Sequence, residues 1–278
     1  MATRLLKEED KQMILDYIQR NSIETSFLYS NILKYGVENK KDIRRSADYF
    51  GFFDEGHLKG ILPFYNLGSC IPHYEMSAAI LPFVQIMKER DFSHLLGMDR
   101  IIRPLYQAIK DIKNIEECND SSYFINKALT PFKIDGLEFF DPRKMKEDEN
   151  VIKFIIQVRN NGFHESVNEE DVVKSLSAAD AEEDAVIAAR DGKMVAYASI
   201  QAYTDSISQI GSVYTAEDER GKGYCKAVVS ELCSKIESRN KMPTLFVRKN
   251  NVPAVKAYSS LGFGYFDDYL FIKLSCKE

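Results

Sequence analysis

A glycine-containing turn precedes a helical pattern in the C-terminal half of the sequence, in the stretch DERGKGYCKAVVSEL (218–232). Gly221 and Gly223 stand directly before the helix, although glycine inside a helix costs about 1 kcal/mol relative to alanine. Backbone amides at a helix start have no partner within the helix, and with the helix dipole they hold phosphate oxygens. A diphosphate can approach these amides closely because glycine carries no Cβ. The turn is therefore a candidate anion-binding site.

The charges around this turn support two interpretations. Arg220 and Lys222 add positive charge, whereas Glu217, Asp218 and Glu219 cancel much of it and are expected to be solvated. The stretch RGKG is therefore also typical of a charged surface turn. It is neither a Rossmann nor a P-loop signature, because GxGxxG and GxxxxGK[ST] are both missing from it.

A second stretch, NNVPAVKAYSSLGF (250–263), follows the next predicted strand. Asn251, Ala254 and Tyr258 are spaced by three and four residues, which places them on one face of a helix. Asn251 is a typical N-cap residue. A tyrosine at this spacing could simply pack against a sheet and hydrogen-bond to a backbone carbonyl.

The sequence around these residues predicts the helices and strands that must position them. It predicts a mixed α/β fold, with a mostly antiparallel central sheet flanked by helices. Apolar spacing and turn residues in the C-terminal half predict the order β-α-α-β-β-β-α-β-α-β. The elements fall at 137–142, 148–163, 168–176, a hairpin over 184–203 around Asp191-Gly192, 207–215, the helix after the glycines, 243–248, 251–262 and 265–274.

The N-terminal half predicts a similar order, which suggests two tandem copies of one fold. Its expected elements are helices 8–20 and 25–36, a hairpin over 48–67, helix 77–90, a strand near 92–97, helix 99–113 and a strand near 122–129. Where the C-terminal copy has the glycine turn, this copy reads SCIPHYEMSAAI, without a glycine-rich turn or an arginine. We expect domains at 1–136 and 137–278, with the linker in the charged stretch 141–150 or just before it.

Several aromatic residues of the N-terminal half are expected in its core rather than in a ligand site. They are Tyr49, Phe50, Phe52, Phe53 and Phe64. This half could shape an acceptor cleft or simply support the fold, and the sequence leaves that choice open.

Composition limits the possible classes of protein. A chain of 278 residues suggests two domains or one large one, at about 100–200 residues per domain. The formal net charge of −5 weighs against a general nucleic-acid binder. No apolar run approaches the roughly 18 residues of a membrane helix, and the N-terminus is not typical of a signal peptide. We therefore expect no nucleic-acid or membrane partner.

The cysteines are five in number and scattered, without a CxxC pair or a Cys/His cluster. Neither a disulfide framework nor a zinc site is supported, so we expect no metal. A reduced, cytoplasmic protein is the default expectation.

Taken together, the two stretches resemble the GNAT superfamily of acyl-CoA-dependent N-acyltransferases. VYTAEDERGKGYCKAVV resembles that family's acyl-CoA loop, R/Q-x-x-G-x-G/A, through Arg220, Gly223 and Cys225, although cysteine departs from the usual Gly or Ala. LFVRKNNVPAVKAYSSLGF is similar to the pattern N-x-x-A-x-x-x-Y-x-x-x-G-F. The resemblance covers roughly 137–278 and is strongest to the branch with glycine N-acyltransferase-like proteins. The N-terminal half resembles a degenerate GNAT domain that lacks the loop.

The resemblance implies that acetyl-CoA is the co-substrate and that its diphosphate lies on the turn, with the pantetheine arm beside the preceding strand. It implies the following cofactor-binding residues: Val213, Tyr214, Thr215, Arg220, Gly221, Lys222, Gly223, Tyr224, Cys225, Lys226 and Asn251. It implies that Tyr258 is the catalytic acid that protonates the leaving thiolate. An amide near Val213 would stabilise the oxyanion.

The general base cannot be assigned by spacing. His164 and Glu165, in the turn between the first two helices of the C-terminal half, could face the acceptor cleft, although His164 is more typical of a surface or capping residue. Cys225 is expected to fill a small helix-start position rather than act as a nucleophile.

Three functions remain open from the sequence. The first is N-acetyl or short-acyl transfer to a primary amine of a small molecule or amino acid, by a monomer or homodimer. The second is a CoA-binding regulatory or sensor module without catalysis, which would also keep the loop. The third is an aminoacyl-tRNA-dependent transferase, a class that pairs two GNAT-like folds but typically lacks an intact loop. An acidic chain is also a poor RNA partner.

Overall fold

The computed structural model describes residues 1–163 and 165–276 and divides the chain into two compact units. Unit 1 comprises residues 1–123 and 266–278, and unit 2 comprises residues 124–265. The units differ from the division at 136/137 that the sequence suggests. Strand β7 (Lys113–Asn126) begins in unit 1 and ends in unit 2, whereas β13 (Phe263–Cys276) begins in unit 2 and ends in unit 1.

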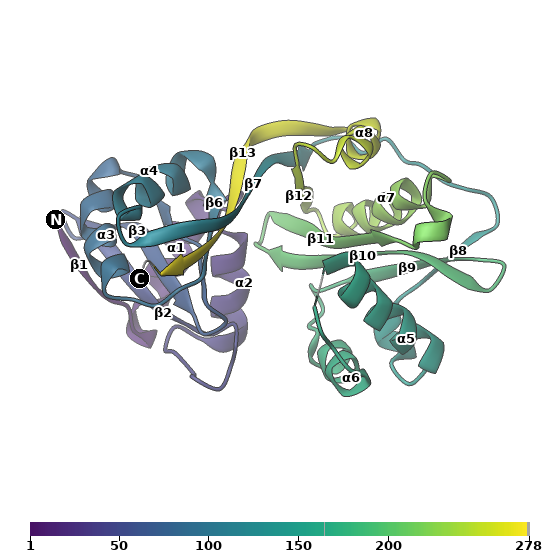
Figure 1. The fold of residues 1–278 in the computed structure, drawn as a ribbon, viewed down its shortest axis with the longest axis horizontal. Coiled ribbons are helices and arrows are strands. Elements are labelled where there is room, and N and C mark those ends of the chain that lie inside the picture. Colours follow the sequence, from purple (N-terminus) through teal and green to yellow (C-terminus); the bar gives the residue numbers. More distant parts are fainter. Residues whose placement is uncertain (164, 277–278) are drawn as a thin grey trace. The chain divides into compact units, whose positions relative to one another are not determined.

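The two units share one order of helices and strands, as expected for tandem copies of one fold, except that unit 1 has the short strands β4 and β5 where unit 2 has the single strand β11 (Figure 1). Unit 1 contains β1 (Ala2–Leu5), η1 (Glu8–Asp10), α1 (Lys11–Arg20), α2 (Ser26–Tyr35), β2 (Ala47–Asp54), β3 (His57–Tyr65), β4 (Ser69–Cys70), β5 (His73–Tyr74), η2 (Ser77–Ala79), α3 (Ile80–Lys88), β6 (His94–Met98) and α4 (Asp99–Ile109). Unit 2 contains β8 (Leu137–Phe140), η3 (Pro142–Met145), α5 (Glu149–Gln157), the π-helical turn η4 (Val158–Gly162), α6 (Glu169–Ala178), β9 (Ala185–Arg190), β10 (Lys193–Tyr203), β11 (Ile207–Thr215), η5 (Glu217–Glu219), α7 (Tyr224–Glu237), β12 (Met242–Arg248) and α8 (Val252–Ser260).

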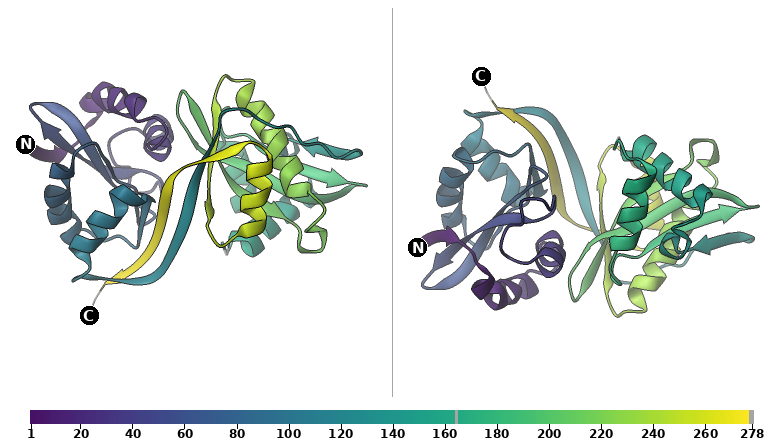
Figure 2. Two further views of the ribbon diagram at one scale, coloured as in Figure 1. Left: turned by 90° about the horizontal axis from the view of Figure 1, so that it is seen from above. Right: turned by 90° about the horizontal axis from the view of Figure 1, so that it is seen from below.

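The strands of unit 2 follow the predicted mixed, mostly antiparallel pattern. Strands β8, β9, β10 and β11 pair antiparallel in that order, and β11 pairs parallel with β12. Helices α7 and α8 lie on one face of these strands, and α5 and α6 lie on the other (Figures 1 and 2). The predicted β9–β10 hairpin turns at Asp191 and Gly192, both of which have positive φ.

Helix α6 begins where the sequence predicts a cap. The side chain of Asn168 accepts from the Asp171 amide at 2.9 Å, and the Asp171 carboxylate accepts from the Asn168 amide at 3.1 Å. This capping box satisfies two amides at the helix start.

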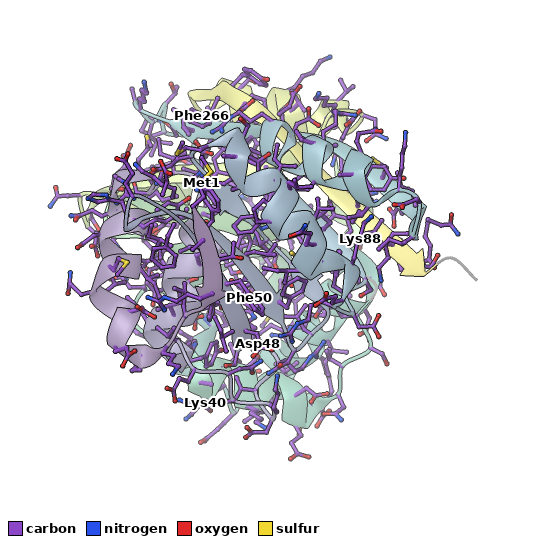
Figure 3. All side chains as sticks on the ribbon, turned by 90° about the vertical axis from the view of Figure 1, so that its left-hand side faces the viewer. Met1, Lys40, Asp48, Phe50, Lys88 and Phe266 are labelled. Atoms are coloured by element: carbon purple, nitrogen blue, oxygen red, sulfur yellow. The ribbon has the colours of Figure 1, made fainter. Side chains whose placement is uncertain are left out.

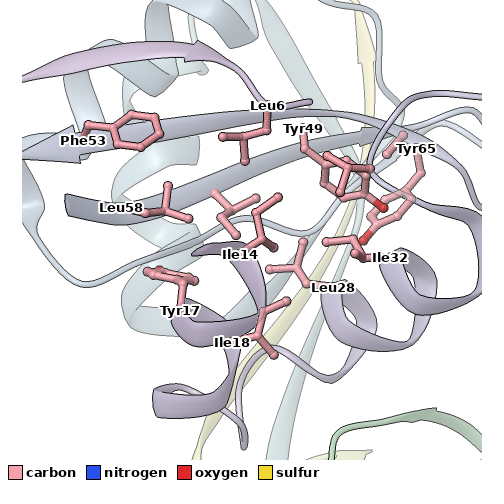
Figure 4. Close-up of a cluster of buried hydrophobic side chains, with 13 residues drawn as sticks. Leu6, Ile14, Tyr17, Ile18, Leu28, Ile32, Tyr49, Phe53, Leu58 and Tyr65 are labelled. Carbon is pink, nitrogen blue, oxygen red and sulfur yellow. The ribbon is translucent and has the colours of Figure 1, made fainter. Parts of the chain in front are cut away.

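The core of unit 1 contains most of the aromatic residues predicted there. Helices α1 and α2 cover one face of the β2–β3 hairpin, where Tyr49 and Phe53 are buried among aliphatic side chains (Figure 4). On the other face Phe52 packs on Phe83 of α3, with 6.3 Å between ring centroids. Phe64 is also buried.

Phe50 is only half-buried and lies beneath a cation on this second face of unit 1. The guanidinium of Arg90 lies 5.0 Å from the Phe50 centroid and donates to Asp48 at 2.9 Å. Figure 3 labels Phe50 and Asp48, which are near each other on β2. Phe50 therefore supports an ion pair rather than the interior of the core.

The charged stretch 141–150, suggested as a linker, is built into unit 2 as η3 and the first turn of α5. Arg143 donates to Asp141 at 2.8 Å and also hydrogen-bonds to Asp184, whose side chain is 5% exposed. Arg239, two residues after the end of α7, pairs with the same aspartate at 2.7 Å. The charges that suggest a linker thus form a half-buried ion-pair network.

We predict that Arg143→Met destabilises the protein by about 3 kcal/mol at pH 7, because it leaves buried carboxylates with fewer partners. Burial alone would raise the pKa of Asp141, but the hydrogen bonds and charge of Arg143 outweigh burial and lower it. The stabilisation is therefore present above the usual carboxyl pKa near 4 and is lost as pH falls through the lower folded-state pKa. Urea unfolding at pH 7 and pH 3 measures both effects.

The control is Lys153→Met, which removes an exposed pair with Glu149 on α5. It should leave the unfolding midpoint unchanged. An equal midpoint for Arg143→Met and the wild type at pH 7 would contradict the assigned role of the network.

No helix in the part of the chain that the structure describes has the length and apolar character needed to cross a bilayer.

Candidate active site

The glycine turn adopts the conformation that exposes backbone amides at the start of α7. Gly221 and Gly223 have φ of +81° and +86°, in the left-handed region that glycine adopts readily. Gly223 is the N-cap and has no side-chain cap. The first helical bond runs from the Ala227 amide to the Gly223 carbonyl at 3.1 Å, so amides 224–226 have no acceptor within the helix. These amides form what we call the amide cradle.

The space around the cradle suits an anion. No atom lies within 4 Å of a Cβ built on Gly221, and a Cβ on Gly223 would touch only side chains, the nearest being Phe132 at 3.4 Å. Lys226 lies with its Nζ 4.0 Å from the Phe132 ring centroid. The residues present therefore fit a diphosphate held by main-chain donors with flanking cations.

The side chain of Glu219 is not solvated, contrary to the expectation from the sequence. Its side chain is only 13% exposed and bridges Lys193 at 2.8 Å and Lys222 at 2.7 Å. Glu217 and Asp218 are 69% and 67% exposed, as predicted. Glu219 is held inward because the β9–β10 hairpin brings Lys193 against η5, which the local sequence does not reveal.

A cavity of about 590 Å³ lies beside this turn in unit 2. It is lined by Ile134, Arg190, Asp191, Lys193, Val195, Glu219, Lys222 and Tyr224. The cations that line it are paired with the acidic residues of the same surface, so the turn as a whole is close to neutral.

The strand before the turn separates from its parallel neighbour and leaves a wedge. Strands β11 and β12 pair from Ile207–Met242 to Ile210–Leu245, and β11 then continues to Thr215 without a further registered pair to β12. On its other edge β11 remains paired with β10 to Thr215. Because the main-chain groups of successive strand residues face opposite edges, only part of the 213–215 main chain faces the wedge, and the Thr215 carbonyl accepts a hydrogen bond from Arg220 Nε at 3.4 Å.

A β-bulge in β11 stands at the base of the wedge. Between the pairs Tyr197–Tyr214 and Ser199–Gly211, β11 has one more residue than β10, and Ser212 has φ of +49°. A bulge of this kind re-aims main-chain groups and is common beside active sites. It gives a physical basis for a free amide near Val213.

The bulge is a feature that the sequence reasoning missed. Its signal was Gly211 in the middle of a predicted strand, since an isolated glycine there suggests a bulge or a close approach. The close approach also occurs, because a Cβ on Gly211 would lie 2.0 Å from the side-chain oxygen of Gln201. Gln201 thus brings an amide group to the base of the wedge.

The side chain of Tyr214 points into the core beneath α5 instead of toward the wedge. Its ring packs edge-on against Phe154, with 6.3 Å between centroids, and its hydroxyl accepts from Gln157 at 3.3 Å. Gly162 in η4 lies against the same ring, where a Cβ would come within 2.8 Å. Only the backbone of Tyr214 is available to a ligand in the wedge.

Tyr258 reaches the start of α7. It is 6% exposed, and Cys225 is close enough to contribute to the shift in the pKa of its hydroxyl. Burial raises the pKa of Tyr258 well above its ordinary value, so the phenol stays protonated at neutral pH. Burial also raises the pKa of the Cys225 thiol to about 11, which agrees with a residue that is not a nucleophile.

Asn251 caps α8 as predicted. Its side-chain oxygen accepts from the Ala254 amide at 3.3 Å, which occupies the group that a cofactor contact would use.

Tyr224 is buried and lines the cavity beside the turn. Glu165 is exposed and its amide donates to the Arg159 carbonyl at 3.1 Å, whereas His164 lies outside the described residues.

Unit 1 has a corresponding change of strand partner after β4, and β5 there contains a buried histidine. Strand β4 pairs parallel with β6, and the chain then moves away so that β5 pairs with β3. There His73, 4% exposed, hydrogen-bonds to the Tyr17 hydroxyl through Nδ1 and lies 3.2 Å from Glu24 through Nε2. Glu24 in turn pairs with Arg100.

Among the described residues, no group of three or more His, Cys, Asp or Glu side chains is placed to hold a metal ion.

Comparison with known proteins identifies the class to which the site belongs. Residues 152–263, which include β11, the glycine turn and α8, match the family described as "Acetyltransferase (GNAT) family". The C-terminal region is therefore a GNAT acetyltransferase domain, and enzymes of that family use acyl-CoA as co-substrate. No curated protein matches the sequence significantly.

Solved structures share the fold over the length of the chain. A Drosophila protein is 12% identical with a TM-score of 0.69, covering 98% of this chain and 98% of that chain. A tandem GNAT protein from the clavulanic acid biosynthesis pathway is 11% identical with a TM-score of 0.62, covering 99% and 98%. A GNAT-family acetyltransferase from Colwellia psychrerythraea is 14% identical with a TM-score of 0.58, covering 99% and 100%. These similarities establish the tandem GNAT fold.

Proposed function

We propose that unit 2 transfers an acetyl or short acyl group from acyl-CoA to a primary amine of a small molecule or amino acid, by direct attack in a ternary complex. The single observation that carries this proposal is the amide cradle at the start of α7, next to the open end of the β11–β12 wedge. The thioester supplies an acyl group that is already activated for attack by an amine.

The chain's own residues would bind and orient the reactants. The amide cradle and Lys226 would hold the diphosphate, and the main chain of 213–215 would pair with the extended arm in the wedge. The amide made available by the bulge at Ser212 would donate to the thioester carbonyl as negative charge develops on its oxygen. Holding both reactants in this geometry removes the entropy cost of their encounter.

Tyr258 would act as the acid for the leaving sulfur. Cys225 belongs to the first turn of α7, and α7 follows the open end of β11 through η5. Because α8 packs against α7 and Tyr258 is close to Cys225, its hydroxyl would lie at the same end of the wedge. Burial keeps this phenol protonated, which is the state that a proton donor needs.

Thermal shift with CoA, acetyl-CoA and longer acyl-CoAs tests the binding part of the proposal. A ligand at about 100 times its Kd should stabilise the protein by about 2.7 kcal/mol. The absence of a shift with every one of these ligands would contradict the assigned cofactor.

A thiol-release screen over amines then separates an enzyme from a sensor that only binds CoA. Glycine and other small amino acids are the first acceptors to test, because of the resemblance to glycine N-acyltransferase-like proteins. Peptides with a free amine form the second set. Binding of acetyl-CoA without thiol release from any acceptor would favour the sensor.

A further inference from the structure

Two β-bulges lie on either side of Gly211, at the base of the wedge. One is the bulge at Ser212 in β11. The other is in β10: Ile200 and Ala202 pair with successive residues of β11, so Gln201 between them is one extra residue in β10. A bulge changes the direction in which a side chain points. Here it directs the side chain of Gln201 across the strand pair to Gly211.

The side chain of Gln201 fills the space directly above Gly211. A Cβ built on Gly211 would overlap the carboxamide of Gln201 and would lie 2.8 Å from its Cγ, and these are the three atoms nearest to that position. The carboxamide therefore occupies the volume that a side chain at 211 would otherwise take. Glycine at this position makes room for it.

This space lies on the face of the sheet that carries α5 and α6. Tyr197 packs against the apolar cluster beneath these helices, and strand alternation places Ser199, the partner of Gly211, on the same face. Ile200 and Ile210 pair with each other and face the opposite side, where α7 packs, and both are buried (Figure 1). In contrast, Ser199 and Gly211 are half-exposed. The α7 face is therefore filled at this point, and the α5/α6 face is open.

An acyl chain on the thioester would be directed toward this space. In the proposed function the arm runs along β11 from Thr215 to Ser212, and the chain beyond the thioester carbonyl continues toward Gly211. It cannot continue between β11 and β12, because these strands pair at Ile210 and Leu245. The buried Ile210 closes the α7 face. A longer chain must therefore turn onto the α5/α6 face, above Gly211.

We propose that Gln201 is a specificity-determining residue, which closes the space above Gly211 and limits the transferred group to acetyl or an acyl chain of similar length. This inference depends on the proposed function. The effect is steric, since the carboxamide takes the volume that further methylene groups would need. A methylene group that a site cannot accommodate typically changes selectivity 10-fold or more.

Calorimetric titration of the full chain with acetyl-CoA and with hexanoyl-CoA tests the proposal without an acceptor amine. The Kd for hexanoyl-CoA divided by the Kd for acetyl-CoA reports the acyl selectivity. We expect a ratio of about 10 or more for the wild type. Gln201→Ala should lower the ratio to about 3 or less, because it opens the space above Gly211. Gln201→Met should keep the wild-type ratio, because methionine has a similar volume without the amide.

Two further variants show whether the volume above Gly211 is responsible. In the Gln201→Ala background, Gly211→Ala adds a methyl group to the space that the first change opens, so it should restore part of the ratio. Ser199→Ala removes a small polar group on the same face and should leave the ratio unchanged. Free CoA carries no acyl chain, so its Kd should change less than about twofold in all of these variants.

The outcomes separate two failures. A wild type without selectivity against hexanoyl-CoA, or a ratio that Gln201→Ala leaves unchanged, would overturn the role of Gln201, whereas binding of CoA would still support the proposed function. A wild type that binds none of the three ligands would remove the proposed function and this inference together.

Discussion

The variant Gly221→Val is expected to lose the stabilisation that acetyl-CoA gives to the wild-type protein. A valine at φ near +81° is strained by roughly 1–2 kcal/mol, and its side chain would occupy the open space in front of the turn. A diphosphate could then no longer approach the amide cradle. We expect the increase in Tm at a ligand concentration of about 100 times the wild-type Kd, equivalent to about 2.7 kcal/mol, to disappear.

Unit 1 offers a matched control for the strain. Gly56, in the β2–β3 turn, has φ of +79°, and like Gly221 it has no atom within 4 Å of an added Cβ. Gly56→Val should lower the Tm of the ligand-free protein by a similar amount but keep the full shift with acetyl-CoA. An undiminished shift in Gly221→Val would mean that the ligand binds elsewhere.

The second large effect is expected from Tyr258→Phe. This variant keeps the ring packing against Phe263 but loses the hydroxyl. A general acid typically contributes 10²- to 10⁴-fold, but CoA thiolate is already a good leaving group, with a thiol pKa near 8.5. We therefore expect kcat to fall about 10- to 100-fold while the KM for acyl-CoA changes less than about twofold, as measured by thiol release with an acceptor from the screen.

The pH dependence provides an independent check on this assignment. Burial raises the pKa of Tyr258 well above its ordinary value, so the wild type should not lose kcat through this group between pH 7 and pH 10. The difference in kcat between the wild type and Tyr258→Phe should become smaller as pH rises above the pKa of the leaving thiol. Above that pH the thiolate can leave without being protonated by an acid.

Tyr203 serves as the control tyrosine, since its hydroxyl donates to Asp180 at 2.8 Å within unit 2. Tyr203→Phe should leave kcat unchanged. If Tyr258→Phe also turns over at the wild-type rate, Tyr258 has no role as an acid.

Local patterns predicted the elements of unit 2 closely. The alternation that predicts a strand over 207–215 matches β11 residue for residue, and the glycine turn and the Asn251 cap lie where the spacing places them. These features depend on contacts between residues near in sequence: helix capping, hairpin turns and apolar periodicity. The sequence therefore contains the information that determines them.

The features that only the tertiary structure decided involve residues far apart in the sequence. Pairing between β10 and β11 creates the bulge at Ser212, and the β9–β10 hairpin turns Glu219 inward toward Lys193. The end of β13 belongs to unit 1, whereas its start belongs to unit 2. No local pattern specifies which distant strand or cation a residue meets, because that choice depends on how the whole chain packs.

The residues of the candidate site also divide into those placed by local sequence and those placed only by tertiary structure. Arg220, Gly221 and Gly223 by themselves determine the turn that we propose binds an anion, because backbone conformation and charge are local properties. Only folding brings α8, which contains Tyr258, against α7, because both helices must pack on the same face of one sheet (Figure 1).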